Sequence, residues 1–207
     1  MLLAAGERGC EAVGVEYGDS AVAQARNLAK ERGLADRVEF VSGDADSLPL
    51  ADAAFDVVIS ECSLCTFADK ARAVGEMRRV LRPEGRLALS DVIADVERLP
   101  SGFRGALGAI ACVGDALPPG AHREVLHGAG FEVLGEEDRS ADVMRMADRI
   151  ADRLRGAKVL GLDGLVPLDG GARAALDLVS EAREAIAEGV IGYTLVLAAR
   201  TDENGEL

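Results

Sequence analysis

Cysteine and aromatic residues are scarce in this chain of 207 residues, which has four Cys, five Phe, two Tyr and no Trp. The four cysteines are too few and too scattered to form a disulfide framework in a domain of this size, so we expect free thiols in a reducing compartment. The first residues carry neither a basic leader nor an apolar signal segment, and no later apolar run is long enough to span a bilayer. These absences predict a cytoplasmic protein.

Positive charge is also in deficit, with 23 Lys and Arg against 36 Asp and Glu and a formal net charge of -13. Such a charge repels phosphate backbones and anionic lipid surfaces, so nucleic acid and membrane partners are disfavoured and a small-molecule substrate is expected. The composition does not indicate an oligomeric state. Without a Pro/Ser-rich or low-complexity run, residues 1–207 are expected to form a single domain.

Short apolar runs alternate with helical patterns through the first half of the chain. We expect strands at Glu11–Glu16, Val38–Val41, Phe55–Ser60 and Arg86–Val92, and helices at Asp19–Arg32 and Asp69–Leu81. Pro83 cannot continue the second helix, and Gly85 allows a left-handed turn after it. This alternation predicts an α/β fold, with a doubly wound parallel sheet covered on both faces.

The second half is richer in helix. We expect helices at Ala121–Ala129, Glu136–Leu154 and Ala172–Glu188, and strands at Phe131–Leu134 and Tyr193–Ala199. The helical stretch between the last two strands is longer than a connection needs, so residues 141–188 are interpreted as an inserted helical cap at the edge of the sheet. The alternating charges from Arg139 to Arg155 are typical of a solvated helix face with ion pairs.

Four motifs in order carry a resemblance to a known family: Gly14–Glu16, Gly43–Pro49, Phe55–Val58 and Arg79–Leu87. Together they resemble the successive motifs of class I S-adenosylmethionine-dependent methyltransferases. The resemblance implies a Rossmann-like sheet, S-adenosylmethionine as cofactor and methyl transfer to a small molecule.

The resemblance also assigns cofactor-binding residues. Ligands of open α/β sheets bind outside the carboxyl ends of the strands, where an acid can accept both ribose hydroxyls. Glu16 has that position, and by resemblance the Asp44 carboxylate and the Ala45 amide meet the adenine, with Tyr17 and Ser60 completing the set. The alternatives are an exposed acid at a strand end for Glu16 and an Asx-turn for Asp44.

One departure from the family concerns its first strand and glycine-rich loop. The sequence opens at Leu2, in a segment that resembles the end of the helix following that loop, and Gly6 and Gly9 do not replace the loop because they precede the second strand. We therefore expect an N-terminally truncated domain in which two apolar strand edges are exposed and the cofactor site is half-formed.

The cysteines point to a substrate. The segments around Cys62 and Cys112, with Ser90-Asp91-Val92, resemble arsenite methyltransferases, in which two thiolates at these positions bind trivalent arsenic; Cys65 is a candidate third ligand. Thiolates suit a soft ion and leave its lone pair free to attack a methyl group. The acid Glu61 and the segment after Leu134 depart from that subfamily. Space-filling cysteines, a carbon, nitrogen or oxygen methyltransferase, and a non-catalytic binding module therefore stay open as alternatives.

The spacing of Cys62 and Cys65 also fits zinc or thiol redox chemistry. A structural zinc site needs two more ligands, and His122 and His127 are the only further histidines. Their helical context favours two solvated histidines, and the surroundings of a thioredoxin motif are missing. We therefore favour neither interpretation.

Overall fold

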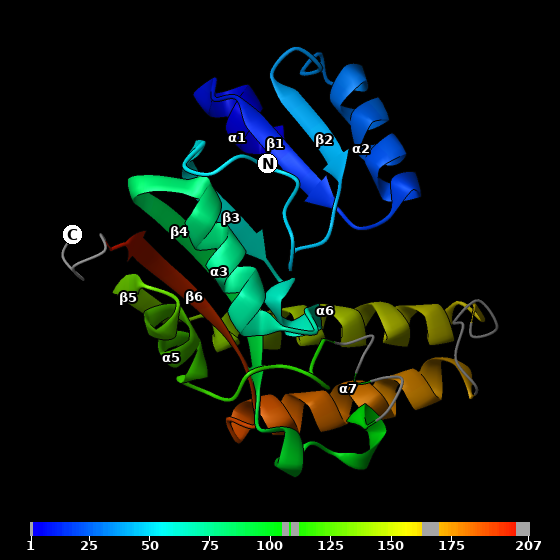
Figure 1. Cartoon of the computed structure of the whole chain (residues 1–207). Helices are drawn as coiled ribbons and strands as arrows, with labels where there is room; N and C mark the ends of the chain where they lie inside the picture. Colours follow the sequence, from blue (N-terminus) through cyan, green and yellow to red (C-terminus); the bar gives the residue numbers. More distant parts are fainter. Residues whose placement is uncertain (1, 105–107, 109–111, 163–169, 202–207) are drawn as a thin grey trace.

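The computed structural model describes residues 2–104, 108, 112–162 and 170–201, and its strands form two separate sheets (Figure 1). The smaller sheet pairs β1 (Ala12–Glu16) with β2 (Val38–Ser42). The larger has the order β3-β4-β6-β5, with bounds Phe55–Glu61, Leu81–Ala94, Ile191–Arg200 and Phe131–Asp138. The α/β class expected from the sequence is confirmed.

Strand directions differ between the two ends of the larger sheet. β1 is parallel to β2 and β3 is parallel to β4, but β6 is antiparallel to both β4 and β5. The expectation of an all-parallel sheet is therefore wrong at β6. The physical reason lies in the connection from β5, where α6 (Ser140–Val159) leads away and α7 (Gly171–Ala187) returns beside it, so that the next strand runs back along β5.

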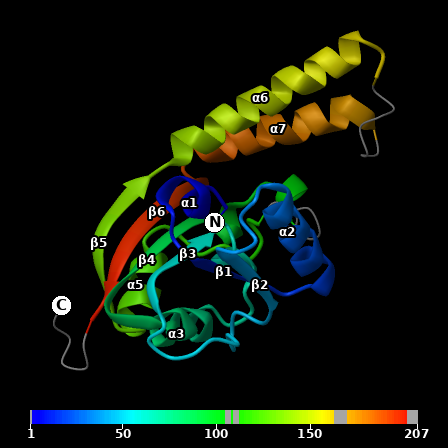
Figure 2. The ribbon, with the colours of Figure 1, turned by 90° about the horizontal axis from the view of Figure 1, so that it is seen from above.

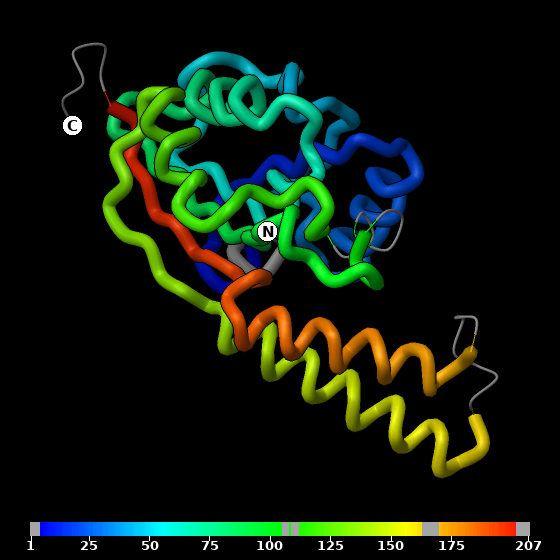
Figure 3. Tube along the Cα trace, turned by 90° about the horizontal axis from the view of Figure 1, so that it is seen from below, coloured from blue at the N-terminus to red at the C-terminus, as the bar shows by residue number. Residues whose placement is uncertain are grey.

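Helices cover the sheets unevenly. Among the residues described, further helices are α1 (Leu2–Arg8), α2 (Asp19–Glu31), α3 (Lys70–Val80) and α5 (Ala121–Gly128), with 3-10 turns at Leu64–Thr66, Val96–Arg98 and Ser101–Phe103. α6 and α7 pack side by side and project from the body of the molecule (Figures 2 and 3). This hairpin lies where the helical insertion is expected, although 163–169, between the two helices, lie outside the described residues. None of the helices described is apolar over a length that would cross a bilayer.

Two predicted boundaries are wrong. Glu136 to Asp138 belong to β5 and not to the following helix, because they pair with Val196 to Thr194 of β6 and cross-strand pairing overrides their helical propensity. The helix begins only at Ser140, whose backbone N–H donates to Asp138 Oδ1 at 2.8 Å, and the hydrogen bonds from Ser140 lower the pKa of Asp138. The Arg139–Arg155 face carries the predicted ion pairs, among them Arg139 to Asp142 and Arg155 to Asp152.

The turn after α3 also differs from expectation. β4 already begins at Leu81, which pairs with Phe55, and the positive φ falls on Glu84 at 63° and not on Gly85. Glycine is needed at Gly85 for space, since a Cβ there would lie 2.8 Å from the carbonyl oxygen of Arg82. Gly85 is thus required where the turn is tight, and its neighbour Glu84 has the left-handed conformation.

Each sheet has its own core. Under α3 and α5 the larger sheet buries Leu81, Leu87, Leu89, Leu126 and Phe131, all 1% exposed or less. A second cluster surrounds the ends of β4 and α7. In the smaller sheet the buried residues of the core cluster are Val38 and Phe40. They pack on Ala5, Val22 and Ala29 from α1 and α2. Most of the buried apolar volume therefore supports the larger sheet.

Candidate functional site

Three cysteines meet at the carboxyl end of β3. The sulfur atoms of Cys62, Cys65 and Cys112 all lie within 4.8 Å of one another. Cys62 directly follows β3 and its backbone N–H donates to the carbonyl of Ser90 at 2.7 Å, while Cys65 lies in the 3-10 turn Leu64–Thr66. Cys112 comes from a loop after β4. We call these residues the three-thiol cluster.

Two of the three cysteines have strained backbones. Cys62 has φ 50° and Cys112 has φ 60°, in the left-handed region that side chains other than Gly, Asn and Asp rarely occupy. Such strain costs on the order of 1 to 3 kcal/mol and gathers at functional sites, where the surrounding structure holds it. The geometry therefore favours a functional cluster over three space-filling side chains.

A buried carboxylate holds the loop that carries the cluster. Asp91, 1% exposed, accepts a hydrogen bond from the backbone N–H of Cys65 at 2.7 Å through Oδ2 and one from Val92 at 2.9 Å through Oδ1. A buried carboxylate needs such partners, since an unpaired one would be strongly unfavourable. Asp91 thus fixes Cys65 against the end of β4.

The two histidines differ in solvent exposure. The prediction that both are solvated is wrong for His122, which is 1% exposed and lies with Nε2 3.9 Å from Asp91 Oδ2, whereas His127 is exposed as expected. The reason is helical periodicity: His122 and Leu126 are one turn apart on the face of α5 that packs on the sheet. Across the residues that the structure describes, the cluster that could hold a metal consists of cysteines alone, so the pairing of cysteines with histidines for zinc is not formed.

The environment disfavours the thiolate forms of Cys62 and Cys65. Burial raises the pKa of Cys62, and a negative charge on Cys112 would raise it further. Burial also raises the pKa of Cys65, whose thiol is hydrogen-bonded to Asp91. At neutral pH Cys62 and Cys65 therefore present neutral thiols to a ligand.

Tyr193 is a further polar group at this site. Its hydroxyl donates to Ser90 Oγ at 3.1 Å, and burial raises its pKa, with a smaller contribution from Cys62. Sequence reasoning missed Asp91 and Tyr193 as parts of the site. Asp91 carried a signal, an acid at the end of a buried strand, but Tyr193 is brought there only by its pairing with Val92.

The cofactor candidates line a large cleft between the two sheets. Glu16, Tyr17, Asp44, Ala45 and Ser60 all border this cleft of about 2270 Å³, which we call the intersheet cleft. Glu16 is exposed at the end of β1, Tyr17 is 82% exposed and Ser60 is buried. The three cysteines are not among its lining residues, although their neighbours Glu61 and Ser63 are. The three-thiol cluster therefore adjoins the intersheet cleft.

The turn after β2 is tightly built. Asp44 Oδ1 accepts the backbone N–H of Asp46 at 3.0 Å, the Asx-turn considered as the alternative role of this residue. Gly43 donates its N–H to the carbonyl of Glu16 at 3.0 Å, and a Cβ on Gly43 would lie 2.6 Å from Pro49 Cδ. The turn thus places Asp44 and Ala45 beside the end of β1, and the Asx-turn occupies only one oxygen of the carboxylate.

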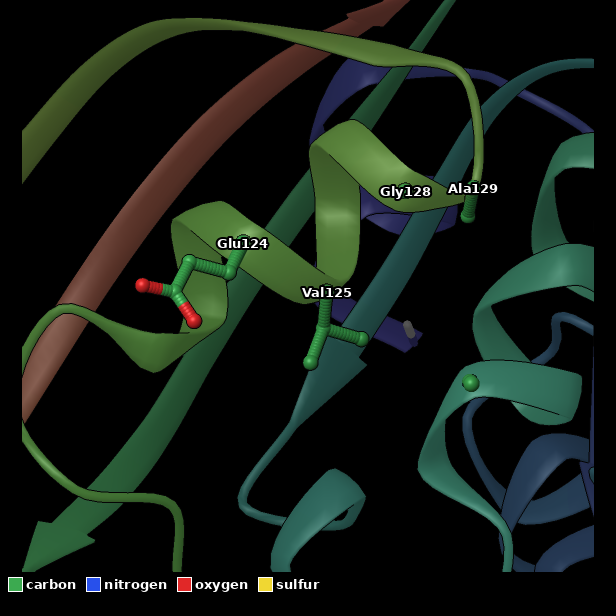
Figure 4. A pocket seen from close by; sticks show the side chains of 5 residues that line it. Glu124, Val125, Gly128 and Ala129 are labelled. Carbon is green, nitrogen blue, oxygen red and sulfur yellow. The ribbon is translucent and has the colours of Figure 1, made fainter.

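A second, smaller pocket of about 360 Å³ lies between α3 and α5 (Figure 4). Its walls are Ala71, Val125, Gly128 and Ala129, and Glu124 is its single charged residue. Binding sites bring several polar groups together, so this pocket is a weaker candidate than the intersheet cleft.

The chain is similar in sequence to known methyltransferases. Residues 1–89 match the family model of a methyltransferase domain. An arsenite methyltransferase of Halobacterium salinarum is 34% identical over 148 residues, 68% of this chain and 36% of that protein. A demethylmenaquinone methyltransferase of Thermus thermophilus is 43% identical over 81 residues, 39% of this chain and 36% of that protein.

The fold is matched over a longer stretch. The crystal structure of a putative sarcosine dimethylglycine methyltransferase from Galdieria sulphuraria has a TM-score of 0.78 at 18% identity, covering 96% of this chain and 72% of that one. The chain spans only about a third of the length of the two curated relatives named above. The motifs in their order, the sheet topology and these matches show that the chain belongs to the class I S-adenosylmethionine-dependent methyltransferases.

Proposed function

We propose that the protein takes part in methyl transfer from S-adenosylmethionine to a small molecule, and that the acceptor is trivalent arsenic bound by Cys62, Cys65 and Cys112. The observation that carries the acceptor is the three-thiol cluster, whose sulfurs lie within 4.8 Å of one another beside the intersheet cleft. Three converging thiols are the ligand set that a soft trivalent ion prefers.

The raised pKa values of the Cys62 and Cys65 thiols support arsenite over a divalent metal ion. Arsenite carries three hydroxyl groups, and each thiol that binds it forms an As–S bond and breaks an As–O bond, while the thiol proton leaves with the hydroxyl as water. The raised pKa values of Cys62 and Cys65 therefore do not oppose binding. A divalent cation instead binds thiolates, so the thiols must lose their protons before it binds. Raised thiol pKa values disfavour that loss.

The cleft residues fit the cofactor. Glu16 is proposed to accept the ribose hydroxyls, Asp44 and Ala45 to meet the adenine, and Tyr17 and Ser60 to border it. Two acids exposed in one cleft, beside a turn that Gly43 keeps narrow, suit a polar nucleoside. When bound, S-adenosylmethionine supplies an electrophilic methyl group.

The role of the protein's own residues is to hold and orient the acceptor. Three sulfur ligands leave the arsenic lone pair as the nucleophile, which forms the As–C bond while the electron pair of the broken C–S bond stays on the donor sulfur. Asp91 holds the loop of Cys65, and the hydrogen bond from the backbone N–H of Cys62 to the carbonyl of Ser90 holds Cys62 at the end of β3. Orientation of this kind is a large part of catalysis in transfers that need no base.

Arsenite binding is the first test. We expect one arsenite per chain in native mass spectrometry, with the mass loss of three waters. Cys62→Ser, Cys65→Ser and Cys112→Ser should each weaken binding about tenfold or more, because a preformed cluster makes each further As–S bond intramolecular. Cys10→Ser, which changes an exposed cysteine outside the cluster, is the matched control. Undiminished binding after Cys62→Ser and Cys112→Ser together would contradict the proposal.

Cofactor binding is tested separately by calorimetric titration of S-adenosylhomocysteine. Glu16→Ala should cost about 1 to 3 kcal/mol, as for hydrogen bonds to a charged group. Glu39→Ala, an exposed acid of β2 that also borders the cleft, is the control. Equal affinity of the parent, the Glu16→Ala and an Asp44→Ala variant would remove this placement of the cofactor.

A carbon acceptor is the second candidate, supported by the 43% identity over 81 residues to the demethylmenaquinone methyltransferase. The two candidates differ in the cysteines. Only the arsenic proposal predicts that methylated arsenic forms from arsenite, glutathione and S-adenosylmethionine and that Cys62→Ser abolishes it.

A further inference from the structure

We propose that His122 is a positioning residue of the three-thiol cluster. From α5 it acts through Asp91 on Cys65, and it thereby determines whether the cluster holds its ligand with three sulfurs or with two. The inference rests on the proposed function, whose ligand set it refines, but the contact between His122 and Asp91 can be tested without arsenic.

The first observation is that His122 is buried without hydrogen bonds. It lies in the first turn of α5, two residues before Glu124 (Figure 4), and its side chain is 1% exposed. Among the residues that the structure describes, neither Nδ1 nor Nε2 of this ring has a hydrogen-bond partner. A buried polar group without a partner is unfavourable, and an apolar ring of similar size would avoid that cost. An imidazole at this position therefore requires a compensating attraction.

The second observation is the carboxylate that lies beside the ring. Nε2 of His122 is 3.9 Å from Oδ2 of Asp91, and both side chains are 1% exposed. This distance is too long for a hydrogen bond, but a ring that carries its proton on Nε2 attracts the carboxylate electrostatically, and the attraction is strong where water is excluded. The backbone N–H of Cys65 donates to the same oxygen at 2.7 Å. One oxygen of Asp91 therefore connects α5 to the loop of Cys65.

The third observation is that Asp91 holds the side chain of Cys65 as well as its backbone. The Cys65 thiol is hydrogen-bonded to this carboxylate, and Cys65 is the buried member of the cluster, 2% exposed. A carboxylate accepts in such a pair, so the thiol hydrogen turns toward Asp91 and the sulfur keeps its lone pairs for a ligand. Cys62 is held differently, through its N–H to the carbonyl of Ser90. Loss of His122 should therefore disturb Cys65 and leave Cys62 in place.

The consequence concerns the number of sulfur ligands. Arsenite has three hydroxyl groups, and each one that leaves as water with a thiol proton is replaced by one As–S bond. Phenylarsine oxide carries a phenyl group on arsenic, so it forms two As–S bonds, and its oxygen leaves with the two thiol protons as one water. Cys62 and Cys112 can supply two sulfurs, but the third comes from Cys65. We expect His122 to affect binding of the first ligand and not of the second.

The first measurement is hydrogen exchange at single amides by NMR, with no arsenical present. His122→Phe keeps a ring and removes both nitrogens, and it should speed exchange of the Cys65 amide about tenfold by weakening its hydrogen bond to Asp91. His122→Gln can place an amide N–H where Nε2 was, so exchange should return to within about threefold of the parent. His127→Phe, the same change at an exposed position of α5, is the matched control and should leave exchange within about twofold.

The second measurement compares the two arsenicals in the same variants. Calorimetric titration of arsenite should give a dissociation constant about tenfold higher in His122→Phe than in the parent, because the third As–S bond is intramolecular only while Cys65 is in place. The dissociation constant of phenylarsine oxide should change less than about threefold, which also shows that the variant remains folded around Cys62 and Cys112. His122→Gln should bind arsenite nearly as tightly as the parent.

Two outcomes would overturn the inference. Exchange of the Cys65 amide that is equal in the parent and in His122→Phe would mean that the ring does not act through Asp91. Equal losses of affinity for arsenite and phenylarsine oxide would mean that the variant loosens the whole cluster. A parent protein that binds neither arsenical contradicts the proposed function instead, and the exchange at Cys65 then decides the role of His122 alone.

Discussion

The two sheets differ in how their stability is supplied. The four-stranded sheet buries large residues such as Leu87 and Phe131 under α3 and α5, whereas the two-stranded sheet buries Phe40 and Val38 against small side chains. Isolated two-stranded sheets are marginal in water. The β1–β2 unit therefore depends for its stability on its attachments to the rest of the chain more than on its own core.

The main attachment is a network between α3 and the loop that joins β2 to β3. Arg79 donates to the carbonyls of Leu48 and Leu50 at 3.0 and 2.8 Å, and Glu76 accepts the backbone N–H of Leu48 at 2.8 Å. Glu76 also receives two hydrogen bonds from Arg79, which raise the pKa of that guanidinium. One helix of the larger unit thus holds the connection to the smaller one.

The largest expected effect comes from deleting a phenyl ring in each core. Phe131→Ala should lower the free energy of unfolding of the larger sheet by about 3 to 5 kcal/mol. Phe40→Ala makes the same chemical change, but we expect it to open only β1–β2 and leave the larger sheet folded. Unfolding in urea, monitored by hydrogen exchange, distinguishes the effects of the two variants. One cooperative transition, shifted equally by both variants, would contradict the comparison.

The next effect comes from cutting the attachment. Arg79→Ala removes charged hydrogen bonds to Leu48 and Leu50 and leaves Glu76 without its main partner, so we expect a loss of about 2 to 3 kcal/mol. The loss should appear first as faster hydrogen exchange in β1 and β2. Arg72→Ala, a neighbouring arginine that donates to the exposed carbonyl of Asp46, is the control and should lose less.

The same network predicts a pH dependence. The hydrogen bond from Arg79 is the largest cause that lowers the pKa of Glu76, so this contribution is fully present above the ordinary glutamate pKa of about 4.3 and is lost as pH falls through the lower folded value. The free energy of unfolding measured from pH 6 to 3 should therefore fall less with acid in Glu76→Gln than in the parent. An unchanged pH profile would remove Glu76 from the attachment.

The smallest effect is expected from an ion pair within the larger unit. Arg82 and Asp56 pair at the surface, with side chains 52% and 79% exposed. Because solvent screens such pairs, Arg82→Ala should change the free energy of unfolding by less than about 0.5 kcal/mol in urea. A loss as large as that of Arg79→Ala would show that surface ion pairs in general, and not the attachment through Arg79, account for the difference between the two regions.

Much of the fold follows from local pattern. Apolar runs and turn residues located all six strands, and the ordered motifs identified the family, because the period of a strand or helix is written in neighbouring residues. Glu16, Asp44 and Cys62 were likewise predicted as candidates, since the ends of parallel strands meet at one edge of a sheet, whereas Cys112 was predicted only through the family resemblance. Boundaries failed where pairing with a distant strand decided them, as at Glu136 to Asp138.

Tertiary structure alone decided which groups converge. Cys112 is 50 positions after Cys62, so only the packing of its loop brings the sulfurs within 4.8 Å. Packing likewise buried His122 and placed Asp91 on the backbone of Cys65. The sequence determined the chemical types and the elements that carry them, because those depend on local periodicity. Distance, burial and proton state depend on contacts between distant residues, which no local pattern contains.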